Sequence, residues 1–428
     1  MKNDPRSHGL WEHSAPPAPP TTVLDRDIVA DVVIVGAGYT GLSAALTLAE
    51  EGRSCVVLDA EEIGFGGSGR NVGLVNAGLW LQPDEVRQQL GDVYGERILT
   101  YLDQAPSAVF DLIRKHDIAC EALRPGTLHC AVGEKGARQL RERERQWQKF
   151  GAPVMFLDAA QTEHLTGSSA YHGSLLDQRA GTIQPLAYAR GLAGAALNAG
   201  ARIHTGSRVM GACRLPGGDW KVQTDNGSVT TPWVIVATNA YTVSPWSSIR
   251  SELVHLPYFN IATVPLPPDL RATVLPESHG IWDTEEILTS VRMDQAGRLV
   301  IGSVGALRGG GQAIHKEWSR RAMERLFPQL KGVAFESGWW GSIGMTSDNV
   351  PRFHHLDERV VTVCGYNGRG IGPGTVFGRA VAELILGKHT SEDMPLPMSA
   401  AVPVRFRNVQ EAWYEVGASA AHLVMDRF

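Results

Sequence analysis

The hydrophobic pattern near the start of the chain predicts a strand, a tight turn, a helix and a second strand. Residues 32–35 are four β-branched apolar residues, and three glycines follow them within six positions. Apolar residues then recur at helical spacing up to Gly52, which is a helix stop. Residues 55–58 form another short apolar run, which ends at Asp59. This order of elements indicates a β-α-β unit.

The spacing of the three glycines is typical of a site for a dinucleotide. Gly36 permits the turn, Gly38 lets the backbone approach a pyrophosphate, and Gly41 lets the helix pack closely on the strand. Phosphates then lie at unpaired N–H groups at the positive end of the helix dipole. Asp59 is placed to accept hydrogen bonds from ribose hydroxyls, and its charge disfavours a 2′-phosphate. At this point FAD and NAD both remain open, and an ordinary strand-turn-helix is the alternative without a ligand.

A second strand, glycine loop and helix stand near the other end of the chain, in "VVTVCGYNGRGIGPGTVFGRAVAELILG". The helix is expected to begin near Thr375 and to end before Gly387. A reduced flavin carries negative charge around N1 and its C2 carbonyl, which a helix N-terminus stabilises, whereas NAD needs no such partner. With one dinucleotide fingerprint and no second one for NADH, the pattern favours FAD held between two helix N-termini.

The middle of the chain predicts a second, mixed part of the fold. Residues 84–149 show helical periodicity, and the charged run "RQLRERERQW" within them is interpreted as a solvated helix face without chemistry. Residues 231–242 contain another buried strand, and "LTSVRMDQAGRLVIGS" resembles a hairpin. The predicted class is therefore α/β with an α+β second domain, in which a Rossmann-like domain is joined to a mixed β-sheet substrate domain.

Composition and charge exclude several other classes of protein. The 428 residues are 43% hydrophobic and 20% charged, which is ordinary for a globular enzyme, and a formal charge of -5 gives no field that attracts nucleic acid. No apolar run approaches the roughly 18 residues of a membrane span, so only peripheral membrane association stays open. The five scattered cysteines are interpreted as reduced thiols in a cytoplasmic protein. His354 and His355 are expected in a surface turn, and no metal is predicted.

Several stretches of the chain resemble one known superfamily, and they occur in the order that it shows. They are "VVIVGAGYTGLSAALTLAEEG", "IGFGGSGRN", "RPGTL", "AGTIQPL", "WVIVATNAY", "FPQLKGV" and "GYNGRGIGPGTVFGRAVAELI", spread from about residue 28 to residue 390. The chain resembles the FAD-dependent D-amino acid oxidase superfamily, which includes glycine oxidase, sarcosine oxidase and D-amino acid dehydrogenase. Within it, the chain most resembles the gamma-glutamylputrescine oxidoreductases.

This resemblance implies a glutathione-reductase-like FAD fold assembled from discontinuous segments. The implied division is an extended N-terminal arm (1–27), an FAD-binding domain (28–83, 175–245 and 336–390), a substrate or cap domain (84–174 and 246–335) and a C-terminal extension (391–428).

The resemblance also implies which residues meet the cofactor. Gly36, Gly38 and Gly41 would face the pyrophosphate, Asp59 the ribose, and Val209 the adenine region. The other implied contacts follow the glycine turn, run along the flavin, lie beneath the cofactor or approach the flavin ring: Tyr39, Thr40, Ala60, Ser68, Gly69, Arg70, Asn71, Val72, Ala237, Thr238, Gly344, Gly368, Arg369, Gly370, Ile371 and Gly372.

The chain departs from the superfamily pattern at four positions. Val72 stands where the pattern usually has glycine, and Gln184 where close relatives tend to have histidine. Gly341 occupies the place of the cysteine that links flavin in sarcosine oxidases, so non-covalent FAD is predicted. Gly372 replaces the lysine that those enzymes use for a substrate carboxylate, so the substrate is not expected to be held there as a simple α-amino acid.

The implied reaction is oxidation of the C–N bond of an amine or amino acid, including a γ-glutamylated polyamine. A hydride passes from the α-carbon to flavin N5, and the imine is hydrolysed. No obligatory base is expected, so no catalytic side chain is assigned. The electron acceptor is left open between oxygen and a quinone or protein.

Six residues are candidates for contact with the substrate. Aromatic rings would enclose a cationic amine, and Arg292 would pair with a distal carboxylate. The candidates are Asn76, Trp80, Tyr258, Trp282, Arg292 and Tyr366.

Two alternatives to an amine oxidoreductase remain at this stage: an NAD-dependent dehydrogenase and a non-catalytic FAD-binding protein.

Overall fold

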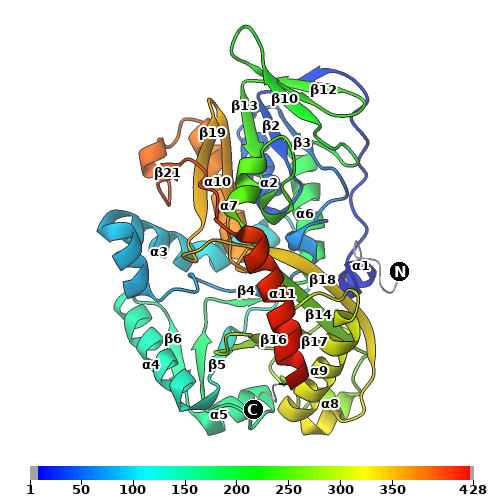
Figure 1. The fold of residues 1–428 in the computed structure, drawn as a ribbon, viewed down its shortest axis with the longest axis vertical. Coiled ribbons are helices and arrows are strands. Elements are labelled where there is room, and N and C mark those ends of the chain that lie inside the picture. The colour runs from blue at the N-terminus through cyan, green and yellow to red at the C-terminus, as the bar shows by residue number, and fades with distance from the viewer. Residues whose placement is uncertain (1–7, 425–428) are drawn as a thin grey trace.

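The computed structural model describes residues 8–424 (Figure 1), and its central layer is a seven-stranded sheet. Neighbouring strands are parallel except at the β19–β20 pair. The predicted strands at residues 32–35 and 55–58 are confirmed as β2 and β3, side by side in this sheet. In spatial order the strands are β21 (Met398–Ser399), β19 (Arg352–Asp357), β20 (Val360–Cys364), β13 (Trp233–Val236), β2 (Val32–Val35), β3 (Cys55–Leu58) and β9 (Arg202–His204).

Three helices pack with this sheet: α2 (Tyr39–Glu50), α6 (Pro185–Asn198) and α10 (Ile371–Ile385). A Cβ atom on Gly41 would lie 2.0 Å from the carbonyl oxygen of Gly36, so glycine is required for α2 to approach the turn this closely. α10 begins at Ile371 rather than near Thr375. The expected start was late because Pro373, in the first turn of α10, is tolerated there.

The second layer is an eight-stranded mixed sheet, seen in the lower half of Figure 1. It contains the predicted hairpin as β16 and β17. β7 pairs with β5 and β6, and β18 pairs with β14, so these two strands of the predicted segments 175–245 and 336–390 are hydrogen-bonded into this sheet. In spatial order the strands are β18 (Phe335–Met345), β14 (Val254–Thr263), β17 (Leu299–Val304), β16 (Thr289–Met293), β15 (Gly280–Asp283), β5 (Thr127–Cys130), β7 (Ser174–Asp177) and β6 (Val154–Leu157).

The remaining elements complete the two layers. A four-stranded sheet contains β1 (Ile28–Val29), β12 (Ser228–Thr231), β11 (Trp220–Gln223) and β10 (Gly211–Arg214), and a two-stranded one contains β4 (Leu74–Val75) and β8 (Gly181–Thr182). The other helices are α1 (Leu10–Ser14), α3 (Pro83–Lys115), α4 (Gly133–Lys149), α5 (Ala159–Thr166), α7 (Ser247–Glu252), α8 (Pro268–Arg271), α9 (Gly311–Leu326) and α11 (Arg407–Val424). Short 3₁₀ turns cover Gly67–Gly69, Asn239–Tyr241, Pro328–Leu330 and Ser391–Asp393.

The N-terminal segment is not wholly extended, which corrects the prediction for residues 1–27 as far as they are described. α1 forms within it, and the Trp11 side chain is fully buried. The indole N–H of Trp11 donates to the Asn71 carbonyl at 2.9 Å, and its ring meets Trp339 edge-on at 5.3 Å. The segment is ordered because this large apolar side chain fills the space between β18 and the loop at residues 65–73.

The histidine pair predicted in a surface turn lies instead in strand β19. His354 is fully buried, and its Nε2 lies 2.6 Å from a carboxylate oxygen of Glu252. The predicted turn was wrong because β19 is an inner strand, with β20 on one side and β21 on the other, whereas His355 is exposed as expected. All five cysteines are free thiols, as predicted. Among residues 8–424, no helix is both long enough and apolar enough to cross a lipid bilayer.

Candidate active site

One large cavity, of about 950 Å³, is lined by residues from both layers. This volume is near the top of the range of about 300–1,000 Å³ that is usual for ligand and cofactor sites. One end of the cavity lies at the carboxyl ends of three parallel strands. Gly36 follows β2 there, Asp59 follows β3 and Ala237 follows β13, and all three residues line the cavity. That is where open α/β sheets bind their ligands. The cavity continues into the eight-stranded sheet, where Tyr258 and Trp282 line it.

Asp59 organises the glycine turn at the first end of the cavity. One carboxylate oxygen accepts the N–H of Ala37 at 2.6 Å, and the other accepts the N–H of Glu61 at 2.9 Å. Burial raises the pKa of Asp59. α2 begins beside this turn, and its N-cap residue, Gly38, offers no side-chain cap. The first turn of α2 is therefore able to receive an anion.

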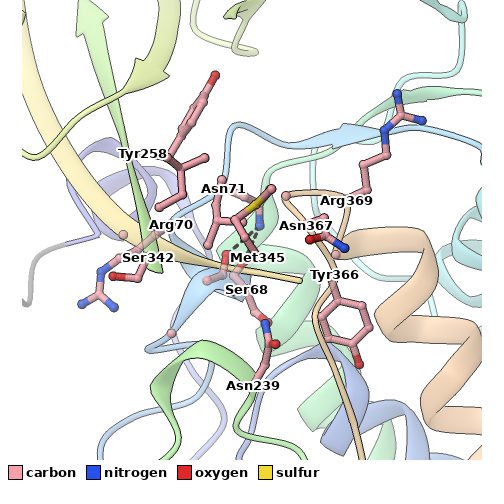
Figure 2. Close-up of a pocket in the computed structure, with 18 of the residues that line it drawn as sticks. Ser68, Arg70, Asn71, Asn239, Tyr258, Ser342, Met345, Tyr366, Asn367 and Arg369 are labelled. Carbon is pink, nitrogen blue, oxygen red and sulfur yellow. Dashed lines mark hydrogen bonds between the residues drawn. The ribbon is translucent and has the colours of Figure 1, made fainter. Parts of the chain in front are cut away.

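The loop at residues 65–73 forms a fixed wall of the cavity (Figure 2). The Asn71 amide donates to the Ser68 carbonyl at 3.0 Å and to the Tyr39 hydroxyl at 3.1 Å, and that hydroxyl donates to the Ser68 carbonyl at 2.6 Å. The carbonyl of Arg70 accepts hydrogen bonds from Asn260 and Trp339 of the cap. Both layers thus hold the loop, which gives the cavity wall a defined shape.

The N-termini of α2 and α10 line the same cavity, as the sequence predicts. The Thr40 and Tyr366 hydroxyls lie 2.6 Å apart, and the Ser43 hydroxyl donates to the Thr375 carbonyl at 2.7 Å. The two helices are in direct contact, because a Cβ on Gly378 would lie 2.3 Å from the Thr40 carbonyl oxygen. Two positive helix ends therefore face one extended space.

Most of the predicted site residues line this cavity, although which atoms of a ligand each would meet stays a prediction. Gly41 and Gly69 are exceptions and serve packing, since a Cβ on Gly69 would lie 2.4 Å from the Gly64 carbonyl oxygen. The predicted cofactor residues along the cavity are Gly36, Gly38, Tyr39, Thr40, Asp59, Ala60, Ser68, Arg70, Asn71, Val72, Val209, Ala237, Thr238, Gly344, Gly368, Arg369, Gly370, Ile371 and Gly372. The predicted substrate residues along it are Asn76, Trp80, Tyr258, Trp282 and Tyr366.

Arg292 lies outside the cavity, which corrects its prediction as a partner for a substrate carboxylate. Its side chain is 1% exposed, and the guanidinium donates to the Ile183 carbonyl. It also lies 3.8 Å from the Glu121 carboxylate and 5.3 Å from the centre of the Trp11 ring. A hairpin position suggested exposure, but β16 is an inner strand and both of its faces are covered.

The cap end of the cavity is aromatic. The Trp80 and Trp282 rings meet edge to face at 5.1 Å, and His129 stacks on Trp282 at 3.4 Å. The guanidinium of Arg369 lies 4.6 Å from the Trp80 ring and 4.7 Å from the Trp282 ring. These rings therefore already contact a cation of the protein itself. Burial, with the nearby charges of Arg143 and Arg369, holds the pKa of His129 well below its ordinary value, so this imidazole is neutral.

Sequence reasoning missed Arg143, which belongs to the charged run interpreted as solvated. Arg143 is buried and lines the cavity, and its guanidinium donates to the carbonyls of Leu79 and Trp80. The spacing contains a signal for this placement, because position 143 falls on the same helical stripe as the buried residues Leu140 and Trp147.

The C-terminal extension contributes to the site through α11, the red helix that crosses in front of the cap sheet in Figure 1. Trp413, Tyr414, Gly417 and Ala418 of this helix line the cavity. Glu411 joins it to the cap through an ion pair with Arg250 at 2.7 Å. No motif in residues 391–428 signals this role, because it depends on where the chain returns in space.

A histidine pair anchors α11, and we expect it to make the docking of this helix pH-dependent. The Nδ1 atoms of His315 on α9 and His422 on α11 lie 2.8 Å apart, so one ring donates and the other accepts. Burial lowers the pKa of His315 from 6.5 to about 4. In the undocked state His315 takes up a proton as the pH falls below 6.5, whereas in the docked state it resists protonation until about pH 4. The docking of α11 therefore loses stability over this pH range.

Hydrogen exchange of residues 407–424, corrected for intrinsic rates, should be faster at pH 5 than at pH 7.5. A His315→Phe variant should lose this pH dependence, and a wild-type rate that is the same at both pH values would contradict the expectation.

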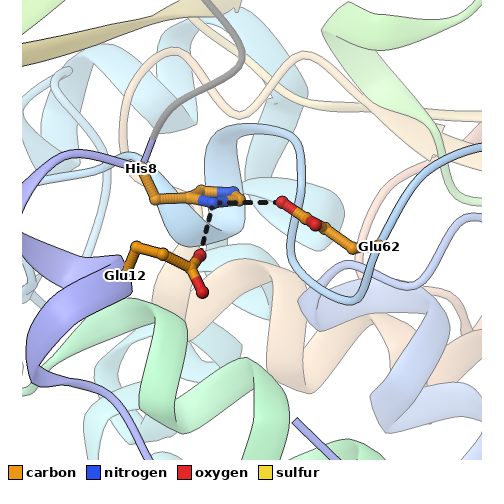
Figure 3. Close-up of side chains that lie close together, drawn as sticks. All are labelled: His8, Glu12 and Glu62. Atoms are coloured by element: carbon orange, nitrogen blue, oxygen red, sulfur yellow. Dashed lines mark hydrogen bonds and ion pairs between the residues drawn. The ribbon is translucent and has the colours of Figure 1, made fainter. Parts of the chain in front are cut away.

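Figure 3 shows a side-chain cluster that joins α1 to the segment before the loop at residues 65–73. Nδ1 of His8 lies 3.2 Å from a Glu12 carboxylate oxygen and 3.4 Å from one of Glu62, and its Nε2 faces the Phe65 carbonyl at 3.3 Å. Each of the three side chains offers one atom that could bind a metal ion, and these atoms lie within 4.8 Å of one another. Arg190 pairs with Glu12 at 2.6 Å, so the cluster contains its own cation and ties α1 to α6.

The parallel sheet, the glycine turn and the cavity at the strand ends define a dinucleotide-binding enzyme of the α/β class. Residues 31–384 match the family described as FAD dependent oxidoreductase, or DAO. The chain is 32% identical over 412 residues to gamma-glutamylputrescine oxidoreductase of Escherichia coli (strain K12), a match that covers 93% of this chain and 95% of the relative. The chain belongs to the FAD dependent oxidoreductase family.

Solved structures show the same fold at low sequence identity. Glycine oxidase from Geobacillus kaustophilus superposes with a TM-score of 0.68 at 19% identity, covering 85% of this chain and 96% of that chain. L-amino acid deaminase from Proteus vulgaris, with its specific insertion deleted, gives a TM-score of 0.70 at 19% identity, covering 91% and 96%. Because residues 31–384 match the FAD dependent oxidoreductase family, the chain is an FAD-binding enzyme, and both earlier alternatives, an NAD-dependent dehydrogenase and a non-catalytic protein, are set aside.

The residues present fit a bound FAD. The N-cap positions of both helices, Gly38 and Gly370, are glycines without side-chain caps, so both ends can approach an extended anionic ligand. A Cβ on Gly38 would come within 2.9 Å of the Ser68 hydroxyl, so a side chain there would narrow the cavity beside the α2 tip.

Proposed function

We propose that this enzyme oxidises the C–N bond of an amine or amino acid with non-covalently bound FAD. The observation that carries the proposal is the continuity of the cavity, which runs from the glycine turn to a chamber lined by Trp80, Trp282 and neutral His129. Bound FAD would supply the hydride acceptor for the carbon beside the amine nitrogen, and the imine so formed would be hydrolysed by water. Support for non-covalent binding comes from Gly341, at the position expected for a linking cysteine, and from the cavity lining, which includes none of the five cysteines.

The side chains of this site position and desolvate their ligands. The α2 tip would hold the diphosphate and Asp59 the ribose, while the α10 tip would stabilise negative charge at the flavin ring. Trp80, Trp282 and the residues of α11 would exclude water from the reacting carbon. No proton-abstracting side chain is required if the amine enters in its neutral form, so no catalytic base is assigned.

The first substrate to try is a γ-glutamylated polyamine, because the Escherichia coli relative at 32% identity carries the name gamma-glutamylputrescine oxidoreductase. Oxygen and a quinone or protein are both candidate electron acceptors. A cytoplasmic location agrees with the five free thiols.

Anaerobic mixing tests the proposal without knowledge of the acceptor. Purified yellow enzyme is combined with γ-glutamylated amines, N-methyl amino acids, D-amino acids and simple polyamines, and absorbance near 450 nm is followed. At least one amine should bleach the flavin. The N-acetyl derivative of the same compound, whose nitrogen lone pair is delocalised, should leave the flavin oxidised. A flavin that no amine of the panel bleaches would remove the proposal.

A further inference from the structure

The outward face of α11 is apolar, and the described part of the chain does not cover it. Apolar residues of this helix recur at intervals of four, three, four and three positions, and all of them are exposed. Their four large side chains are between 63% and 73% exposed. Single exposed apolar residues are common, but a continuous apolar patch usually marks an interaction site. The residues are Val409, Trp413, Val416, Ala420 and Leu423, and together they form the α11 stripe.

The opposite face of α11 is fixed to the cap, so the stripe is held facing outward (Figure 1). Ala418 and His422 are 3% and 2% exposed, and Glu411 makes an ion pair with Arg250 at 2.7 Å. An isolated helix of 18 residues is only marginally stable in water. Because the cap already orders α11, a partner can bury the stripe without the entropic cost of ordering the helix.

The spacing of the stripe indicates that its partner is another helix. Intervals of four and three are those of the a and d positions of a coiled coil, in which each apolar side chain fits between side chains of the facing helix. The facing helix needs the same spacing, and a second copy of α11 has it. A two-fold axis brings the same surface of two copies together, so one stripe can serve both sides of the contact.

The residues that border the stripe carry no charge, so two copies of α11 can approach each other without repulsion. In a coiled coil the e and g positions lie beside the partner helix, where like charges are unfavourable. The corresponding residues of α11 are Gln410, Ala412, Gly417 and Ser419. Large side chains are absent from these four positions, which also allows a close approach of the two backbones.

The charges of α11 argue against a lipid surface as the partner. Helices that lie on membranes usually carry several Lys or Arg residues on their polar face, which attract anionic lipids. The charged residues of residues 407–424 are Arg407, Glu411 and Glu415, so acidic residues outnumber basic ones. Glu411 and Glu415 are moreover paired with Arg250 and Arg308 of the cap. The helix therefore offers lipid an apolar stripe without the usual basic flank.

We propose that two copies of this chain associate through the α11 stripe, each stripe packing on that of the other copy around a two-fold axis. The inference involves neither a substrate nor an electron acceptor, so it stands or falls separately from the proposed function. Trp413 belongs both to the stripe and to the cavity lining. The second copy would therefore lie beside the active-site cavity.

The mass of the FAD-loaded enzyme in solution tests the proposal. Light scattering after gel filtration and sedimentation velocity are measured from about 1 to about 100 µM protein. The wild type should reach twice the mass of one chain at the upper concentration. Val416→Glu places a carboxylate in the middle of the stripe and should raise the dissociation constant at least about 100-fold, because that charge would be buried without a partner. Leu423→Glu, at the end of the stripe, should change it in the same direction.

Val93→Glu is the matched control. Val93 lies on α3 and is 66% exposed, as is Val416, but it is not part of the stripe. This variant should leave the dissociation constant within about 2-fold of wild type. Neither valine lines the cavity, so both variants should keep the flavin absorbance of the wild type. A wild type that stays monomeric at about 100 µM, or a dimer that Val416→Glu does not weaken, would overturn the inference.

Sedimentation with lipid vesicles distinguishes a second copy from a membrane. Vesicles of phosphatidylcholine and phosphatidylglycerol should leave the wild-type enzyme in the supernatant. Sedimentation of the wild type with the vesicles, abolished in Val416→Glu, would assign the stripe to a lipid surface and overturn the inference.

Discussion

Replacing Gly41 with valine should yield a protein without FAD that unfolds well below the wild-type temperature. Even the Cβ atom of the new side chain would lie 2.0 Å from the Gly36 carbonyl oxygen and 3.1 Å from a methyl carbon of Ile34. The atom in the way belongs to the backbone, which cannot rotate aside as a flexible side chain can. α2 must therefore move away from β2, and its N-terminus moves out of the cavity with it. We expect a loss of about 3 kcal/mol in stability, measured by thermal unfolding, together with loss of absorbance near 450 nm.

Gly194 provides the matched control for this substitution. It also lies in a helix that packs on the seven-stranded sheet, but a Cβ there would meet no atom within 4 Å. Valine has a helix propensity no worse than that of glycine, so Gly194→Val should keep its FAD and its unfolding temperature. A Gly41→Val protein that is as yellow and as stable as Gly194→Val would contradict the close packing of α2 on the glycine turn.

The β2–α2–β3 unit was predictable because every determinant of it is local. Residues 32–35 are a β-branched apolar run that favours a buried strand, the glycines favour a turn, and the helix follows within the same few residues. The start of α10 was less predictable, since Pro373 suggests a break when the sequence is read alone. His354 was misplaced for another reason: its environment is made by Glu252, which is distant in sequence and adjacent only in the fold.

The cofactor end of the cavity was easier to predict than the substrate end. Glycine motifs mark the first end, because a backbone that approaches phosphate tolerates few other residues. The substrate end is assembled from side chains whose roles depend on long-range packing. Arg143 and Arg292 illustrate this: the arginine expected in solvent lines the cavity, and the arginine expected at the substrate is bonded to the Ile183 carbonyl outside it.

Three departures from the superfamily pattern have packing explanations. Val72 packs against the cluster that contains Trp11, and the amide of Gln184 donates to the Trp11 carbonyl at 2.9 Å. Both residues therefore contact α1 where it packs against the rest of the protein. Gly372 lies against α3, where a Cβ would approach the Ala105 side chain to 3.1 Å. Gly372 takes away the lysine side chain expected in the cavity, but that lysine would contact the substrate and not the flavin, so these departures do not argue against a reactive flavin face.

The other prediction with a large effect concerns a buried charge cluster beneath β19. Glu252, 6% exposed, accepts a bond from His354 at 2.6 Å and one from Arg352 at 3.1 Å. Arg352 also pairs with Asp348 at 2.9 Å. Burial favours the neutral form of Glu252, but the bond from His354 and the charge of Arg352 outweigh it, so the pKa of Glu252 lies below its ordinary value of 4.5.

Glu252→Ala should therefore lower the stability of the protein by about 3–5 kcal/mol. The substitution removes the carboxylate that faces Nε2 of buried His354 and that pairs with Arg352, and it leaves an unfilled space beside them. The midpoints of urea and thermal unfolding measure the loss, with Glu358→Ala, on the exposed turn after β19, as a control that should stay within about 0.5 kcal/mol of wild type. A carboxyl group whose pKa is lower in the folded state than in the unfolded state stabilises the fold at pH values above its unfolded-state pKa. That contribution disappears as the pH falls through the folded-state pKa. The difference between wild type and Glu252→Ala should accordingly be full at pH 7 and shrink below pH 4.5. A difference that is the same at pH 7 and pH 4 would show that Glu252 acts by packing alone.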